Sequence, residues 1–194
     1  MSVQRLVCSG CGRPQSVCLC AALQPRGLPP GLTLMILQDK HEARHPLSTA
    51  PLLQRSFPDS RLLVGEVFSA DEVLGDTAMA NIALLYPLTH KPALAAEHYA
   101  DVRCLIVLDG TWRKVKKMLL NNPWLTDLPH LALQLQQPGR YAIRTSPRAD
   151  GVSTLEATVL ALNALHPAGQ YDKTLTVLDL LVQQQLQFGH KKQP

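Results

Sequence analysis

The segment LDGTW at residues 108–112 brings a carboxylate, a glycine, a hydroxyl and a large aromatic ring into five positions. Asp109 follows an apolar run, and Thr111 opens a helical pattern, so the segment is predicted to lie where a strand ends and a helix begins. Ligands collect at such places in α/β sheets, because helix N-termini offer free backbone amides. The alternative is that Asp109 or Thr111 only caps the helix and that Trp112 lies in the core.

The helix predicted to follow this turn has one apolar face and one basic face. Its cations occupy four of five consecutive positions, at Arg113, Lys114, Lys116 and Lys117. The formal net charge of the chain is only +4, so the position of these cations matters more than the total. They could bind the phosphates of a nucleic acid, or they could form an ordinary solvated face.

A second loop, followed by a predicted helix, is GVSTLEA at residues 151–157. Ser153 and Glu156 have the spacing of a capping box, which accounts for both residues without any function. The preceding loop nevertheless carries three arginines, Arg140, Arg144 and Arg148, and arginine is suited to binding carboxylates and phosphates.

A third polar segment, LQDKHEARHPLSTA at residues 37–50, follows the first predicted strand. It contains His41, Arg44 and His45 and ends in a predicted helix start at Ser48 and Thr49. Because each of the three polar loops adjoins a predicted strand end, we expect them to converge on one pocket.

Four of the five cysteines lie within thirteen residues, at Cys8, Cys11, Cys18 and Cys20. Four thiolates in two close pairs are typical of a structural Zn²⁺ site, although an iron–sulfur cluster also takes four cysteines. The remaining possibility is four reduced surface thiols. We expect zinc in a closed, structural site in a small N-terminal segment.

The elements that must position these residues alternate between apolar runs and helical patterns. We expect strands at 32–37, 61–67, 82–85, 104–108 and 131–135, and helices at roughly 46–55, 91–100, 111–121, 153–165 and 172–188. This alternation predicts an α/β fold with a mainly parallel sheet covered by helices on both faces. The Pro/Gly-rich stretch before residue 31 predicts a boundary between a cysteine segment at 1–28 and an α/β domain at 29–194.

Composition places the chain among globular proteins, with 46% hydrophobic and 18% charged residues in 194. No apolar run is long enough to cross a bilayer, and the first residues lack the pattern of a secretory signal. We therefore expect a cytoplasmic location, no membrane contact and no obligate protein partner. The chain contains no GxGxxG, GxxxxGK[ST] or GxSxG motif, which argues against dinucleotide-binding, P-loop and hydrolase-elbow sites.

Four blocks in this order, CSGCGRPQSVCLC, LQDKHEARHPLSTA, LDGTW and VSTLEA, resemble the DTW-domain family of tRNA-uridine aminocarboxypropyltransferases. The resemblance runs from Cys8 to about Leu165. It implies S-adenosylmethionine as cosubstrate, tRNA as substrate, and a fold similar to the knotted SPOUT methyltransferases, so a trefoil knot is one expectation. Alternatives are an S-adenosylmethionine-dependent RNA methyltransferase and a non-catalytic, zinc-dependent RNA-binding module.

The resemblance also implies roles for individual residues. The family signatures fall on Asp109, Thr111 and Trp112, expected to be catalytic, and on Ser153, Thr154 and Glu156, expected to contact the cofactor together with Leu108, Gly110 and Arg144. Asp109 is the natural candidate to accept the proton of uridine N3. RNA contacts are expected from Arg44, Arg113, Lys114, Lys116 and Lys117.

Overall fold

The computed structural model describes residues 6–133, 139–140 and 151–187 of the chain. Its strands are β1 (Thr33–Asp39), β2 (Arg61–Gly65), β3 (Ile82–Leu85), β4 (Cys104–Asp109) and β5 (His130–Leu131). Its α-helices are α1 (Ala50–Ser56), α2 (Ala70–Leu74), α3 (Trp112–Asn121), α4 (Trp124–Asp127), α5 (Thr154–Leu165) and α6 (Thr176–Gln187). Short 3-10 helices are η1 (Gln15–Val17), η2 (Glu42–Arg44), η3 (Met79–Asn81), η4 (Ala96–Asp101), η5 (Pro167–Gly169) and η6 (Tyr171–Leu175).

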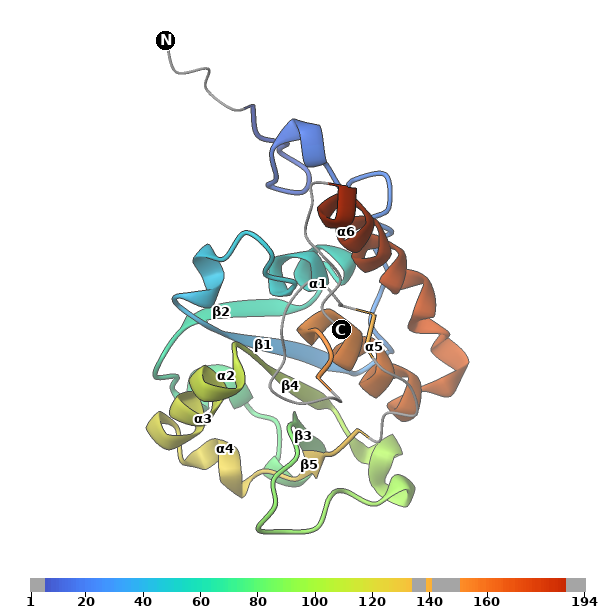
Figure 1. Cartoon of the computed structure of the whole chain (residues 1–194). Helices are drawn as coiled ribbons and strands as arrows, with labels where there is room; N and C mark the ends of the chain where they lie inside the picture. The colour runs from blue at the N-terminus through green and yellow to red at the C-terminus, as the bar shows by residue number, and fades with distance from the viewer. Residues whose placement is uncertain (1–5, 134–138, 141–150, 188–194) are drawn as a thin grey trace.

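The five strands form one parallel sheet in the order β2-β1-β4-β3-β5. Successive side chains of a strand point to opposite faces, and both faces are buried here. Leu34 and Ile36 of β1 pack with α1, α5 and α6, whereas Met35 and Leu37 pack with α2, α3 and α4. Figure 1 shows these two groups of helices on either side of the sheet. The α/β prediction, with a parallel sheet covered on both faces, is confirmed.

Several predicted elements differ in extent from the observed ones. The α-helix expected at 91–100 was wrong: residues 91–95 form no helix, and only the 3-10 helix η4 forms after them. The two short helices α2 and α4 were not predicted from the sequence. The last predicted helix begins as η6 and continues as α6. The last predicted strand, 131–135, matches β5 only at Leu131, because residues 132–133 are not in a strand and residues 134–135 lie outside the described residues. The SPOUT-like fold and the trefoil knot stay predictions.

The N-terminal cysteine segment packs against the α1, α5 and α6 side of the molecule (Figure 1). Leu19 is fully buried in the same core cluster as these helices. The Arg26 guanidinium donates to the backbone oxygens of Gly169 and Gln170 at 2.8 and 2.7 Å and lies over the Tyr171 ring. The division of the chain at residue 28 stays a prediction, but the two parts share apolar contacts.

No helix among the described residues has the length and apolar character needed to span a bilayer.

Candidate active site and cysteine cluster

An open pocket lies at the carboxyl ends of β3 and β4, with about 820 Å³ of empty space, part of it open to solvent. Its lining is mostly apolar and comprises Leu85, Tyr86, Pro87, Val107, Leu108, Gly110, Trp112, Val115, Leu131, Leu133, Val152, Thr154 and Ala157. Small-molecule sites in proteins have this character and size, with a few polar groups that fix the ligand. The predicted convergence of LDGTW and VSTLEA on one pocket is therefore observed.

Asp109 lies next to this pocket, between the lining residues Leu108 and Gly110, and is 4% exposed. Its Oδ2 accepts hydrogen bonds from the Gln38 amide at 2.8 Å and from the Ser48 hydroxyl at 3.4 Å. Its Oδ1 accepts a hydrogen bond from the Thr154 hydroxyl at 2.5 Å. A buried carboxylate needs such donors, because an unsatisfied charge inside a protein is costly.

This network joins three segments that are far apart in the chain. Gln38 is the penultimate residue of β1 and lies directly beside Asp109 of β4 in the parallel register. The same Gln38 amide also donates to Ser48 at 2.8 Å, in the loop before α1, and Thr154 begins α5. We name these four residues, Gln38, Ser48, Asp109 and Thr154, the Asp109 network.

Sequence reasoning identified Asp109 and Thr154 but missed Gln38 and gave Ser48 only the role of a helix start. Ser48 does not cap α1, whose N-cap residue is Thr49. The available signal was the amide of Gln38, directly after the mostly apolar run TLMIL. A buried polar side chain requires a partner, and here the partner is Asp109.

Thr111 and Trp112 have different surroundings. Thr111 is the N-cap of α3, and its hydroxyl accepts a hydrogen bond from the Lys114 backbone N–H at 3.4 Å, so the capping alternative holds for this residue. Trp112 is half-buried in the pocket wall rather than in the core. Its ring lies 5.8 Å from that of Tyr86 at an interplanar angle of 51°, so the two aromatic rings form one edge of the pocket.

Gly110 connects Asp109 to this helix through a crowded turn. A Cβ at this position would lie 3.2 Å from the Lys114 Cβ and 3.6 Å from the Asp39 Cβ. The glycine therefore lets β4 enter α3 close against the end of β1 and leaves room for the pocket.

Ser153 is the N-cap of α5, as predicted, and Glu156 binds Arg140. The Ser153 hydroxyl accepts a hydrogen bond from the Glu156 backbone N–H at 3.2 Å. The Glu156 carboxylate accepts from the Arg140 backbone N–H at 2.9 and 3.1 Å and so holds residues 139–140 against α5. Burial raises the pKa of the Glu156 carboxyl, and the Arg140 backbone N–H opposes this shift. Arg144, the other predicted cofactor contact, lies outside the described residues.

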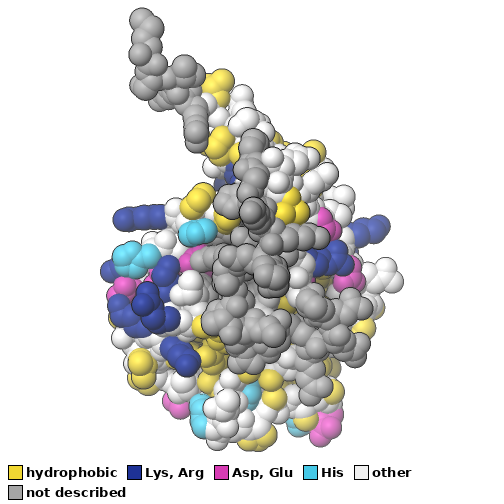
Figure 2. Space-filling model, viewed as in Figure 1, with side chains coloured by type: hydrophobic (Ala, Val, Ile, Leu, Met, Phe, Trp, Pro, Cys, Tyr) yellow, Lys and Arg dark blue, Asp and Glu magenta, His cyan; other side chains and the backbone are white. Residues whose placement is uncertain are grey.

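The predicted RNA-binding cations lie on and beside α3. Arg44, Arg113, Lys116 and Lys117 are exposed. Lys114 is only 26% exposed, and its ammonium lies 3.1 Å from a Glu42 carboxylate oxygen and 3.6 Å from one of Asp39. Figure 2 shows lysine and arginine side chains gathered on the side of the molecule that carries α2 and α3.

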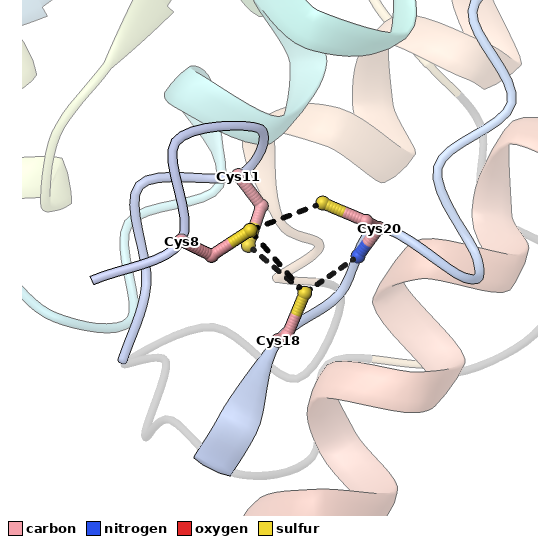
Figure 3. Close-up of side chains that lie close together, drawn as sticks. All are labelled: Cys8, Cys11, Cys18 and Cys20. Carbon is pink, nitrogen blue, oxygen red and sulfur yellow. Dashed lines mark hydrogen bonds between the residues drawn. The ribbon is translucent and has the colours of Figure 1, made fainter. Parts of the chain in front are cut away.

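The four N-terminal cysteines form a compact cluster away from the pocket. Their Sγ atoms all lie within 4.8 Å of one another, and Figure 3 shows the side chains pointing toward a common centre. The Cys8 and Cys20 sulfurs are 3.5 Å apart, and the Cys11 and Cys18 sulfurs 3.7 Å apart. The Cys11 backbone N–H, followed by the thiols of Cys20 and Cys18, lowers the pKa of the Cys8 thiol to about 6. The cluster could therefore hold a metal ion.

Side chains of the helical body bind the backbone around this cluster. Arg55 of α1 donates to the Gly10 oxygen at 2.8 Å, and Gln184 of α6 donates to the Cys18 oxygen at 3.2 Å. Arg13 donates to the oxygen of Pro46 at 3.0 Å, two residues before Ser48 of the Asp109 network. The cysteine cluster is thus connected to one of the loops that form the candidate active site.

The cysteine turn also depends on glycine. A Cβ on Gly10 would lie only 2.8 Å from the Cys20 sulfur, closer than real Cβ contacts come. Gly12 has φ +69°, a backbone conformation that glycine adopts without strain.

Comparisons with known proteins agree with these features. The family described as "DTW domain" matches residues 5–186. The protein named tRNA-uridine aminocarboxypropyltransferase 2 of Mus musculus is 31% identical over 198 residues, covering 96% of this chain and 65% of that protein. tRNA-uridine aminocarboxypropyltransferase A of Arabidopsis thaliana is 26% identical, covering 98% of this chain and 85% of that protein.

A relative from Drosophila melanogaster, also named tRNA-uridine aminocarboxypropyltransferase 2, is 30% identical and covers 89% of this chain and 71% of its own. The chain spans slightly less than two thirds of the length of the mouse and macaque relatives, 65% in each case. No solved structure matches the chain.

Proposed function

This chain belongs to the DTW-domain family, and we propose that it transfers the 3-amino-3-carboxypropyl group of S-adenosylmethionine to N3 of a tRNA uridine. The names of the similar proteins support the reaction class and the substrate. The expected cytoplasmic location belongs to the same proposal.

The observation that carries the proposal is that three of the four sequence blocks meet at Asp109, and that two of them, LDGTW and VSTLEA, line the pocket beside it. The first polar block supplies Gln38 and Ser48, LDGTW supplies Asp109, and VSTLEA supplies Thr154. A buried polar network beside an apolar pocket at the carboxyl edge of a parallel sheet is a typical small-molecule site.

The reaction forms one bond and breaks another. Uridine N3 loses its proton and attacks the γ-carbon of the amino-acid arm, while the bond from that carbon to the sulfonium sulfur breaks. The electron pair of the broken bond stays on sulfur, so 5′-methylthioadenosine leaves as a neutral thioether. Attack at the γ-carbon rather than at the methyl requires that carbon to lie in line with N3, which makes positioning the main task of the pocket.

Within this proposal, the apolar lining around Leu108, Gly110 and Trp112 holds the adenosyl part of the cosubstrate. Trp112 stacks on a base, and Thr111 fixes the start of α3 beside it. Ser153 and Glu156 hold the turn before α5, and Arg144 is the proposed partner of the cosubstrate carboxylate.

Asp109 has two possible roles in this reaction. As a general base it accepts the N3 proton, and as a positioning group it holds the pocket edge together. The second role agrees with its burial and with the hydrogen bonds from Gln38, Ser48 and Thr154. Thr154 both donates to Asp109 and lines the pocket, so it links the buried carboxylate to the bound substrates.

Zinc is the metal that best fits the cysteine cluster. Tetrahedral coordination at the usual Zn–S length of about 2.3 Å places neighbouring sulfurs about 3.8 Å apart. The sulfur pairs Cys8–Cys20, Cys8–Cys18 and Cys11–Cys18 lie at 3.5, 3.5 and 3.7 Å. The cysteines of an iron–sulfur cluster bind iron atoms rather than one shared ion, which separates their sulfurs further. The four thiolates occupy all positions of a tetrahedral ion, so the proposed zinc is structural.

One reaction distinguishes this proposal from its rivals. Unmodified tRNA is incubated with the protein and S-adenosylmethionine, and both the nucleoside by-product and the modified base are identified by mass spectrometry. The proposal expects 5′-methylthioadenosine and a uridine heavier by one aminocarboxypropyl group. S-adenosylhomocysteine with a methylated base would establish the methyltransferase instead, and tRNA binding without any by-product would establish the binding module.

A further inference from the structure

A set of exposed cations surrounds the exposed side of α3, next to the pocket wall. We name this set the α3 basic face, and it consists of Lys40, Arg44, Arg113, Lys116 and Lys117. Lys116 lies one helical turn after Trp112, on the same side of α3, and Trp112 lines the pocket. The face therefore begins where the pocket opens.

Lys114 does not belong to this face, although its sequence position suggested it. Glu42 is 1% exposed and Asp39 5% exposed, so Lys114 compensates two buried carboxylates. Loss of one partner of such a group leaves an uncompensated buried charge. Lys114 consequently fastens α3 to the loop after β1 and is a positioning residue.

Glu66 lies within the α3 basic face and is shared by two of its members. Lys40 lies 3.1 Å from one oxygen of this carboxylate, and Lys117 lies 3.4 Å from the other. The hydrogen bond from Lys40 is the main cause that lowers the pKa of the Glu66 carboxyl, so Glu66 is charged at neutral pH. The two lysine side chains remain 55% and 61% exposed, and ion pairs this exposed are weak. A phosphate group can replace Glu66 as their partner.

We propose that the α3 basic face binds the phosphate backbone of tRNA beside the pocket mouth, and that Glu66 weakens this binding by competing for Lys40 and Lys117. This inference rests on the proposed function. Among the described residues, Glu66 is the acidic side chain that forms ion pairs with this face, through Lys40 and Lys117. Phosphate recognition by exposed lysine and arginine is strong in low salt and weak in high salt, because binding releases counterions.

The test is a titration of unmodified tRNA with each variant at several salt concentrations, without S-adenosylmethionine. Lys117→Ala and Arg113→Ala are each expected to weaken binding by roughly threefold or more and to reduce the salt slope by about one. Glu66→Gln removes the competing charge and is expected to tighten binding by roughly threefold. Lys114→Met is expected to lower thermal stability instead, because Glu42 and Asp39 lose their cation.

Two control variants change net charge by the same amount elsewhere. Lys173→Gln in η6 and Glu97→Gln in η4 alter exposed residues that form no ion pair within the described part of the chain. If these controls change tRNA affinity as much as the face variants do, only net charge matters and the inference is overturned. Normal binding by Lys117→Ala and Arg113→Ala overturns it as well.

The same proteins separate a failure of this inference from a failure of the proposed function. Wild-type protein that modifies uridine while the face variants bind tRNA normally shows that the RNA lies elsewhere on an active enzyme. Wild-type protein that binds tRNA through the face, but forms no 5′-methylthioadenosine, shows that the binding surface is correct and the reaction is not.

Discussion

The Asp109 carboxylate and the Gln38 side-chain amide are 2.8 Å apart, although 71 positions separate them in the chain. They meet because β1 and β4 are neighbouring parallel strands whose register pairs these two residues. A single residue of slippage would move one side chain to the opposite face of the sheet. The Asp109 network is therefore a direct product of strand register, and it brings the loop before α1 and the start of α5 to the same point.

Gln38→Leu tests whether this network stabilises the fold and the pocket. Leucine fits a buried strand position but removes the donor of two hydrogen bonds, so Asp109 loses one partner inside the protein. We expect a loss of about 1–3 kcal/mol in the free energy of unfolding. Urea denaturation measures this loss, and calorimetric titration with S-adenosylmethionine measures the expected weakening of cosubstrate binding.

Gln183→Leu is the matched control, because Gln183 is exposed on α6. Its free energy of unfolding is expected to change by about 0.5 kcal/mol or less. Equal stability of the Gln38→Leu variant and the control would show that the amide contributes nothing to the network.

Asp109→Asn keeps the shape of the side chain but removes the charge and places a second amide against Gln38. We expect turnover to fall by about 10²–10⁴, as is typical for the loss of a general base. Formation of 5′-methylthioadenosine measures turnover, and circular dichroism confirms the fold. Near-normal turnover would reduce Asp109 to a structural residue.

The two roles of Asp109 predict different changes in S-adenosylmethionine affinity when its contact with Thr154 is removed. Thr154→Val removes the hydroxyl that donates to Asp109, whereas Thr154→Ser retains it. If the carboxylate acts by positioning, the valine variant binds S-adenosylmethionine more weakly and the serine variant does not. A fall in turnover with unchanged affinity in the valine variant would favour proton transfer through this pair.

Sequence alone predicted the sheet, the helix after LDGTW and the cysteine cluster, because each depends on local spacing. The apolar run at 104–108 is long enough to indicate a buried strand, and Ser153 with Glu156 indicates a helix start. Contacts between residues far apart in the chain could not be predicted from local spacing. Nothing near Lys114 in the sequence shows that it pairs with Glu42, because the ladder between β1 and β4 creates that proximity.

The short helices α2 and α4 were not predicted, for a related reason. α2 has five residues, and its start depends on the Ser69 hydroxyl, which accepts from the Glu72 backbone N–H, and its end on Gly75 at φ +53°. Five residues are too few for a helical period to emerge above the surrounding sequence. Ser69 is a residue type that favours the N-cap position. The start of α2 could have been predicted from this residue, without any helical period.

The burial of Glu156 predicts a pH dependence of stability. Burial raises the pKa of this carboxyl in the folded state above its ordinary value near 4.5, so the folded protein binds the proton more tightly than the unfolded chain. The contribution of Glu156 is therefore most favourable below pH 4.5 and is lost as pH rises through the folded pKa.

Glu156→Gln removes this titration while its amide oxygen can still accept from the Arg140 backbone N–H. Unfolding free energies of wild type and variant are compared from pH 4 to pH 7. We expect wild type to lose stability relative to the variant as pH rises. A constant difference across this range would mean that the carboxyl does not titrate differently in the folded protein.

Cys18→Ser tests the cysteine cluster and its connection to the pocket. The change removes one of four proposed zinc ligands, so we expect the metal content of purified protein to fall from one ion per chain toward zero and the melting temperature to drop. The segment holds Arg13, whose guanidinium binds the Pro46 oxygen close to Ser48. We therefore expect weaker binding of both tRNA and S-adenosylmethionine, measured in separate titrations.

Cys104→Ala is the control for this experiment, because Cys104 is buried in β4 away from the cluster and burial raises its pKa to about 11. This variant is expected to keep its full metal content even if it loses some stability. Arg13→Gln then separates the two effects, since it leaves all four thiolates in place but weakens the contact with Pro46. If Arg13→Gln binds zinc and S-adenosylmethionine like wild type, the cluster supports its own segment alone and the active-site loop does not depend on it.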